Sequence, residues 1–222
     1  MNQIKLNPFA FSALDPKAQA GIKDAVKLLI LLFWGQGGQK DWLKLVLNSH
    51  ETWKSLANIH GLKNLAIIQT VDDLMRKYPS EMLQQELESE FVKIFINTRS
   101  GVSAPLYHSC YHGDENILMN KPALEMADLL EQAGIDLDSG IGEPPDHLCI
   151  ELEYLFFLLN HPHVHSDPDL QEYIQMFTRE FMLPWIDIFQ QRIPVRGVSV
   201  FFSHSALAMR KLLFFIGRGV QT

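Results

Sequence analysis

The segment PPDHLCIELEYLFFLL, residues 144–159, decides the fold of this 222-residue chain. Leu148, Leu152, Leu155 and Leu159 follow one another at steps of four, three and four, the spacing of one face of an α-helix. Most residues between them are apolar too, so the helix is apolar almost all round and should be buried. We therefore predict that this segment forms the central helix of an all-α protein.

The same period continues in both directions along the chain. Asp15 is a good N-cap for a helix that has Pro16 in its first turn and that Gly35 can close. Pro184 has to break or kink a helix, because its ring clashes with the carbonyl four residues back. Further helical stripes are expected at 83–98, 120–133, 170–183 and 201–215.

Evidence for strands is thin. Val198–Phe202 is rich in β-branched and aromatic residues, but its apolar stripe continues with helical spacing to Phe215. The sequence contains no internal repeat. We predict a compact all-α fold of eight to ten helices.

A cluster of glycines and prolines marks the best candidate boundary, at Asp136–His147, which also holds four acids and no cation. We predict two helical subdomains, 1–137 and 148–222, joined by a hinge loop at 138–147. A long surface loop within one domain is the alternative.

Composition excludes several classes of protein. With 47% hydrophobic and 20% charged residues the chain is not disordered, and a net charge of −7 argues against nucleic-acid binding. The two cysteines, Cys110 and Cys149, are too few for a disulfide scaffold. Residues 1–11 do not resemble a signal peptide. The most hydrophobic stretch, Leu28–Trp34, is much shorter than a membrane-spanning helix. We expect a cytoplasmic protein without stable membrane insertion.

Charge is concentrated in residues 114–153, which carry eleven acids against one cation, Lys121, and so a net charge of −10. A negative field beside an apolar helix would attract a partner that is cationic at one end and apolar beyond it. Solvated helix faces are the alternative explanation. The acids are Asp114, Glu115, Glu125, Asp128, Glu131, Asp136, Asp138, Glu143, Asp146, Glu151 and Glu153.

Motifs for catalysis are weak. His161, His163 and His165 alternate and could hold zinc in an extended strand, so a metal-dependent helical hydrolase using this loop is the alternative function. His108, Cys110 and His112 alternate in the same way, without a fourth ligand at zinc spacing. The glycines at 35, 37 and 38 lack the preceding strand and the Gly-Lys-Ser/Thr of a phosphate loop.

The start of the central helix has two interpretations. Asp146 lies where the first-turn amides of a helix lack partners, so it could serve only that helix start. His147 and Glu151 are four residues apart and would share a helical face, where the carboxylate would favour the imidazolium. The second interpretation is a polar recognition point at the junction of the two subdomains.

Three segments resemble, in order, the signatures of the TorD/DmsD/NarJ family of redox-enzyme maturation chaperones. EPPDHL at 143–148, followed by ELEYL at 151–155, is similar to the family's acid-Pro-x-Asp-His signature. APLYHSCY at 104–111 resembles its Pro-aromatic-x-Ser-x-aromatic segment, and FMLPW at 181–185 resembles its Leu-x-Pro-Trp helix break. The resemblance covers roughly residues 80–216.

The resemblance implies an all-helical, two-part chaperone without enzymatic activity or a cofactor. Family members bind the twin-arginine signal peptide of a molybdenum-cofactor reductase subunit and hold that subunit in the cytoplasm until its cofactor is loaded. Such a leader has two adjacent cations followed by an apolar stretch, so it needs acids beside an apolar groove. The predicted partners are this leader and the apoprotein of a molybdoenzyme catalytic subunit, bound by a monomer or a domain-swapped dimer. The predicted peptide-binding residues are Asp146, His147, Tyr107, Ser109, Glu143 and Glu151.

Overall fold

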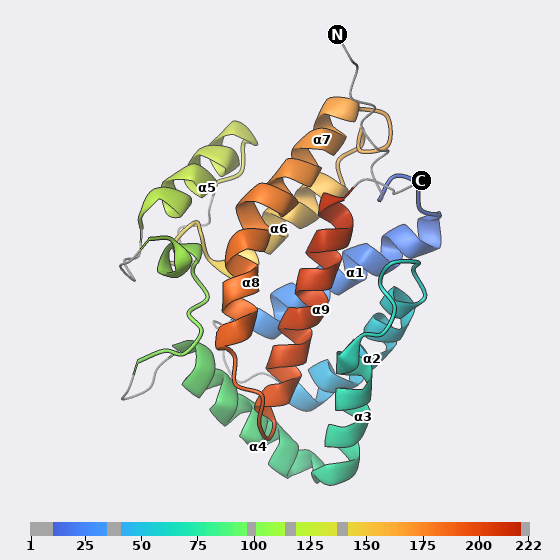
Figure 1. Cartoon of the computed structure of the whole chain (residues 1–222), viewed down its shortest axis with the longest axis vertical. Helices are drawn as coiled ribbons and strands as arrows, with labels where there is room; N and C mark the ends of the chain where they lie inside the picture. Colours follow the sequence, from blue (N-terminus) through green and yellow to red (C-terminus); the bar gives the residue numbers. More distant parts are fainter. Residues whose placement is uncertain (1–10, 35–40, 97–100, 114–118, 137–141, 219–222) are drawn as a thin grey trace.

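A computed structural model describes residues 11–34, 41–96, 101–113, 119–136 and 142–218, and in these it contains nine α-helices and no named strand (Figure 1). The prediction of an all-α fold of eight to ten helices is confirmed, and Val198–Phe202 is helical apart from Val198, the N-cap. The helices are α1 Pro16–Phe33, α2 Trp42–Ala57, α3 Ala66–Lys77, α4 Ser80–Phe91, α5 Lys121–Gln132, α6 Leu148–Leu159, α7 Pro168–Met176, α8 Leu183–Arg192 and α9 Ser199–Gly217. Shorter helical turns are η1 Val92–Ile96, η2 His108–Tyr111 and η3 Phe177–Met182.

Helix α1 begins as its sequence indicates. The Asp15 carboxylate accepts hydrogen bonds of 2.9 Å from the backbone N–H groups of Lys17 and Ala18, and Pro16 occupies the first turn, where its missing N–H costs nothing. The helix ends at Phe33. Gly35, expected to close it, and the glycines at 37 and 38 lie outside the described residues.

Helix α6 carries the leucine stripe predicted for residues 148–159, and all four leucines of the stripe are fully buried. The helix begins at Leu148, four residues later than the prolines suggested. It packs against α1, whereas α9 packs against five helices: α1, α3, α4, α7 and α8. The structural centre is therefore α9, and α6 is buried against α1 and α7 (Figure 1).

Pro184 divides a long helical run, as predicted. The run starts as α7, becomes the π-helical turn η3 at Phe177–Met182 and continues as α8. Pro184 has no N–H for an intrahelical hydrogen bond, so the wider π-helical turn accommodates it and places it in the first turn of α8. The break gives α7–η3 a face that α8 does not continue.

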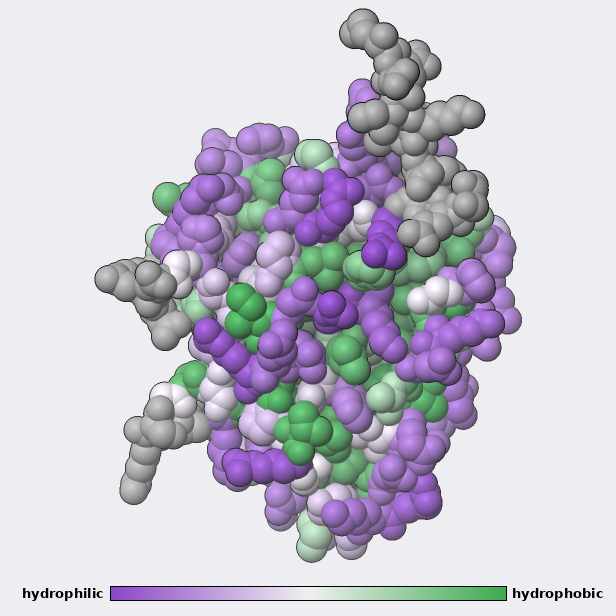
Figure 2. Space-filling model, viewed as in Figure 1, coloured by the Kyte–Doolittle hydropathy of each residue, from purple (hydrophilic) through white to green (hydrophobic). Residues whose placement is uncertain are grey.

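Helix α5 lies at the edge of the molecule (Figure 1). It packs against the short turn η2, and its side chains Pro122, Ala123, Met126 and Leu130 are buried. The outward face of α5 carries the exposed acids Glu125, Asp128 and Glu131, together with the exposed Leu124. On the face that Figure 2 shows, hydrophobic side chains come to the surface between hydrophilic ones.

One described helix, Ser199–Gly217, is long and apolar enough to cross a membrane by length and composition. The hydrophobic stretch Leu28–Trp34, which the sequence singles out, is shorter than this helix. In the fold, 61% of the apolar window of α9 is buried against other helices, so the structure explains its apolar character as that of a core helix.

One hydrophobic cluster extends through the described chain, from Phe11 to Ile216. It includes α1, which precedes the predicted hinge at 138–147 and contacts both α6 and α9, which follow it. Residues 137–141 of that hinge lie outside the described residues. The division into subdomains 1–137 and 148–222 therefore stays a prediction.

Candidate functional site

Two signature segments are joined side by side. Tyr107 and His147 form an isolated antiparallel bridge, flanked by two backbone hydrogen bonds. The His108 N–H donates to the Asp146 carbonyl at 3.0 Å, and the Leu148 N–H donates to the Leu106 carbonyl at 2.7 Å. The bridge brings residues 106–109 next to the start of α6 and gathers most of the predicted site residues at one place.

Asp146 is fully buried and does not cap α6. Its Oδ2 atom accepts a hydrogen bond of 2.7 Å from the backbone N–H of Ser109, the second residue of the turn η2. Asp146 Oδ1 and Ser109 Oγ are also buried and have no hydrogen-bond partner among the described residues. Asp146 therefore connects two distant segments, and the interpretation that it serves only the helix start is wrong for this residue.

His147 provides the cap instead. Its Nδ1 atom accepts a hydrogen bond of 3.1 Å from the backbone N–H of Cys149. The imidazole lies edge-on to two aromatic rings, Trp34 at 5.4 Å and Tyr107 at 5.3 Å between centroids. With 2% of its surface exposed, His147 is a packed helix cap and not a surface group.

Tyr107 and Glu143 form the accessible part of the cluster. The Tyr107 hydroxyl donates a hydrogen bond of 2.7 Å to Glu143 Oε2, and both side chains are half-buried. Burial, with the neighbouring Glu143 carboxylate, raises the pKa of the Tyr107 hydroxyl, so it stays protonated and remains a donor. Of the six predicted residues, these two are the ones that a peptide can reach without rearrangement.

Glu151 is fully buried and lies among side chains that sequence reasoning did not select. Its Oε1 atom is 3.1 Å from His108 Nδ1, and its Oε2 atom accepts a hydrogen bond of 3.0 Å from Trp185 Nε1. The expected pairing of Glu151 with His147 is not observed, because the His147 side chain turns back to cap the helix. Glu151 instead links α6 to η2 and α8.

Burial sets the protonation of this group. It raises the pKa of Glu151 well above its ordinary value and lowers the pKa of His108 to about 4. The nearby Asp146 carboxylate opposes the shift of His108 and adds to that of Glu151. Burial therefore favours the uncharged form of both side chains.

His108 and Trp185 are the residues that the sequence analysis missed as site members. His108 lies inside the signature segment 104–111 and Trp185 inside 181–185, so the family resemblance could have selected both. The rings stack at 5.3 Å, and the His108 ring also lies edge-on to Phe181 at 4.9 Å. All three signature segments thus meet in one buried cluster, composed of Ser109, His108, Asp146, His147, Glu151 and Trp185.

The histidine loop lies elsewhere in the fold. The rings of His161 and His163 are 5.5 Å apart, and the His161 side chain accepts a hydrogen bond from the His163 backbone. The His165 ring stacks on Phe11. Among the described residues no three His, Cys, Asp or Glu side chains are grouped so that they could hold a metal ion. The hydrolase alternative has no support from this arrangement.

Most acids of the negative segment lie at the surface of the described part. Glu125, Asp128, Glu131 and Asp136 are exposed, so the solvated-face explanation holds for part of the set. Asp114, Glu115 and Asp138 lie outside the described residues. Asp146 and Glu151 are buried and do not contribute a surface field.

Residues 59–191, more than half of the chain, match the family model described as nitrate reductase delta subunit. Several similar proteins are each described as chaperone protein TorD. The one from Photobacterium profundum is 30% identical over 56% of this chain and 59% of its own length. The one from Vibrio parahaemolyticus is 37% identical over 40% and 41%, and the one from Aliivibrio salmonicida is 29% identical over 70% and 75%. The chain thus spans less than two thirds of the first two relatives.

One solved structure to which the chain is similar is described as a redox enzyme maturation protein from Archaeoglobus fulgidus. It is 24% identical, with a TM-score of 0.49, over 86% of this chain and 93% of that one.

Proposed function

This chain belongs to the nitrate reductase delta subunit family, which is the TorD/DmsD/NarJ family of maturation chaperones, and we propose that it binds the twin-arginine signal peptide of a molybdenum-cofactor oxidoreductase subunit. It acts in the cytoplasm and holds the subunit until the cofactor is loaded, before export. It performs this role by binding, without catalysis. The client is the apoprotein of the catalytic subunit, and the chaperone works as a monomer or a domain-swapped dimer.

The observation that carries this proposal is the convergence of the three signature segments on one cluster. Side chains from positions as distant as Ser109, Asp146 and Trp185 are joined by specific hydrogen bonds. An ordinary helix start needs one capping group, which His147 already supplies. Buried polar groups cost free energy unless they are bonded, so these hydrogen bonds hold the three segments in one arrangement.

The accessible pair supports a role for this region in peptide binding. Glu143 is a half-buried carboxylate, and Tyr107 holds that carboxylate by a hydrogen bond of 2.7 Å. A bond between an arginine and a carboxylate is charge-assisted and stronger than a neutral one. The other four predicted residues are buried and support this pair from the interior of the fold: Asp146, His147, Ser109 and Glu151.

The test is calorimetric titration with two synthetic peptides. One carries two adjacent arginines followed by about a dozen apolar residues, and the other carries two glutamines in their place. Preferential binding of the arginine peptide is expected. Equal affinity for both peptides would contradict the proposal and indicate a general helical adaptor.

The client is identified by a second experiment. The tagged chain is recovered from its native cytoplasm, and the co-purifying proteins are identified by mass spectrometry. A molybdoenzyme catalytic subunit that still carries its leader is expected. Its absence from the recovered proteins, with the leader peptide unbound in the titration, would reject the chaperone role.

A further inference from the structure

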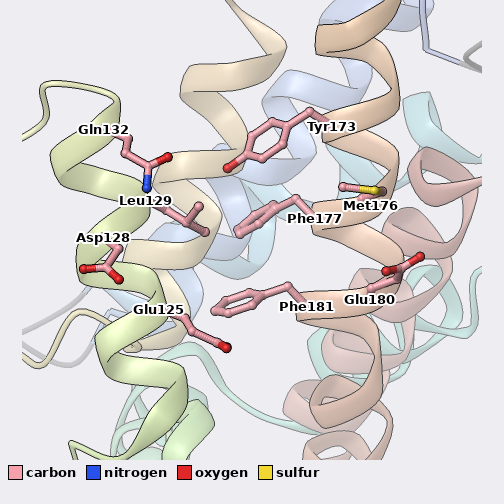
Figure 3. Close-up of a pocket in the computed structure, with 9 residues that line it drawn as sticks. All are labelled: Glu125, Asp128, Leu129, Gln132, Tyr173, Met176, Phe177, Glu180 and Phe181. Carbon is pink, nitrogen blue, oxygen red and sulfur yellow. The ribbon is translucent and has the colours of Figure 1, made fainter.

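A groove of about 430 Å³ lies between α5 and the α7–η3 run (Figure 3). Phe177 and Phe181 point from η3 toward α5, and Leu129 points back from α5 toward them. The groove therefore has an apolar floor formed by three large side chains. Its rim is exposed at Glu125, Asp128 and Glu180, and α5 lies at the edge of the molecule (Figure 1).

The rim of the groove is acidic. Glu125 and Asp128 stand on the α5 side and Glu180 on the η3 side, and among the described residues no lysine or arginine lines the groove. Glu125 pairs with Lys121 at 3.2 Å and Glu180 with Arg179 at 2.7 Å, both at exposed positions. Exposed pairs of this kind contribute little, so an incoming cation can replace the partner.

We propose that this α5–η3 groove receives the leader, with its apolar stretch on the aromatic floor and its arginines against the acidic rim. The inference rests on the proposed function and names its contact surface. Charge and apolar character fit in the same order as in the leader, cations beside an apolar run. The signature residues by themselves offer a peptide mainly Tyr107 and Glu143, because Asp146, Ser109 and Glu151 are fully buried.

The signature residues then act as positioning residues for the groove. Asp146 holds the Ser109 N–H, and the Ser109 carbonyl accepts a hydrogen bond of 3.1 Å from the Asn120 side chain. Asn120 is the residue immediately before α5, so this chain of bonds fixes the start of one wall. Since α5 packs on η2, the same bonds also hold the surface on which α5 rests.

The opposite wall rests on the same cluster. Phe181, part of the floor, lies edge-on to His108 at 4.9 Å, and His108 is bonded to Glu151. Trp185 stacks on His108 from α8, directly after η3. Both walls of the groove therefore depend on the buried cluster, which explains why residues that a peptide cannot touch belong to the signature.

Charge reversal on the rim tests the contact surface. Asp128→Lys and Glu180→Lys are each titrated with the arginine peptide defined above. Matched controls are Glu131→Lys on α5 and Glu172→Lys on α7, exposed acids outside the groove lining. Affinity should fall about three- to tenfold in each rim variant, as for loss of an exposed ion pair with added repulsion, and should change less than twofold in the controls.

Three outcomes would overturn the inference in distinguishable ways. Equal weakening in rim variants and controls would show an effect of net charge only. Unchanged affinity in the rim variants, with loss in Glu143→Gln, would place the peptide at the signature surface and leave the proposed function intact. No binding by the unaltered chain would reject the proposed function together with this inference.

The positioning role has its own readout. Hydrogen exchange of the α5 amides should accelerate in Asp146→Ala more than exchange in α1 or α9, because the tie to Ser109 and Asn120 is lost. Asp146→Asn should restore slow exchange, since its amide oxygen can accept from the Ser109 N–H. Uniform acceleration in all helices would show a general loss of stability and contradict the positioning role.

Discussion

The backbone N–H of Ser109 donates a hydrogen bond of 2.7 Å to Asp146 Oδ2, across 37 residues of sequence. Both residues are fully buried, so the bond is screened from water and its loss leaves an amide without a partner. This bond makes Asp146 a connector between η2 and the start of α6.

The first prediction follows from that bond. Asp146→Ala should lower the free energy of unfolding by about 1–3 kcal/mol, the cost of a buried group left unsatisfied. Asp146→Asn should lose less, because its oxygen can still accept from Ser109. Urea denaturation of the two variants compares them directly. Equal stability of Asp146→Ala and the unaltered chain would show that the bond contributes nothing.

His147 is expected to behave as a helix cap. His147→Ala should cost about 1 kcal/mol of unfolding free energy, because the Cys149 N–H loses its acceptor. His147→Asn should retain most of the stability, since asparagine is a good N-cap. Thermal melting of both variants checks this. A large loss in His147→Asn would assign the main contribution to packing against Trp34 and Tyr107.

The leucine stripe of α6 should contribute strongly to stability. Leu152→Ala and Leu155→Ala remove fully buried side chains and should each cost about 2–5 kcal/mol. Phe157→Ala on the same helix is the control, because Phe157 is 41% exposed and should cost much less. Denaturation midpoints that do not differ between the stripe variants and the control would mean that α6 is not part of the core.

The buried pair predicts a specific pH dependence. Burial lowers the pKa of His108 to about 4, so its stabilising contribution is present above the ordinary pKa of 6.5 and is lost as pH falls from 6.5 toward 4. The pKa of Glu151 is raised, so its contribution is present below its ordinary pKa of 4.5 and is lost as pH rises through the folded value. Between pH 7 and pH 5 the two effects oppose each other.

Glu151→Gln removes one of the two effects. In this variant the free energy of unfolding should fall by about 2 kcal/mol between pH 7 and pH 5, because only the His108 contribution remains. The unaltered chain should show a smaller loss over the same interval. The measurement is urea denaturation at both pH values. The same pH dependence in both proteins would contradict the neutral pair.

Leader binding should weaken as salt is added. Two arginines that meet exposed carboxylates such as Asp128 are screened as ionic strength rises, since the Debye length falls from about 10 Å at 0.1 M to about 3 Å at 1 M. Titrations of the arginine peptide at low and high salt measure the change. Affinity that stays constant across this range would show that the acidic segment is only a solvated surface.

The sequence by itself determined the class of the fold and several local starts and breaks. Asp15 and Pro16 start α1, and Pro184 marks the change from η3 to α8. Both effects are local, because capping and the missing proline N–H act within a few residues of the chain. The leucine period of residues 148–159 likewise identified a buried helix. Such local effects are readable from the sequence.

The tertiary structure decided what the signature residues do. The cap of α6 is His147 and not Asp146, and Glu151 bonds to His108 and Trp185 instead of His147. These partners are 34 and 43 residues from Glu151, and no local spacing selects them. The groove beside α5 is likewise created only when η2 and η3 meet across the buried cluster. Distant packing fixes which polar groups are buried together, because a buried donor or acceptor needs a partner wherever the fold supplies one.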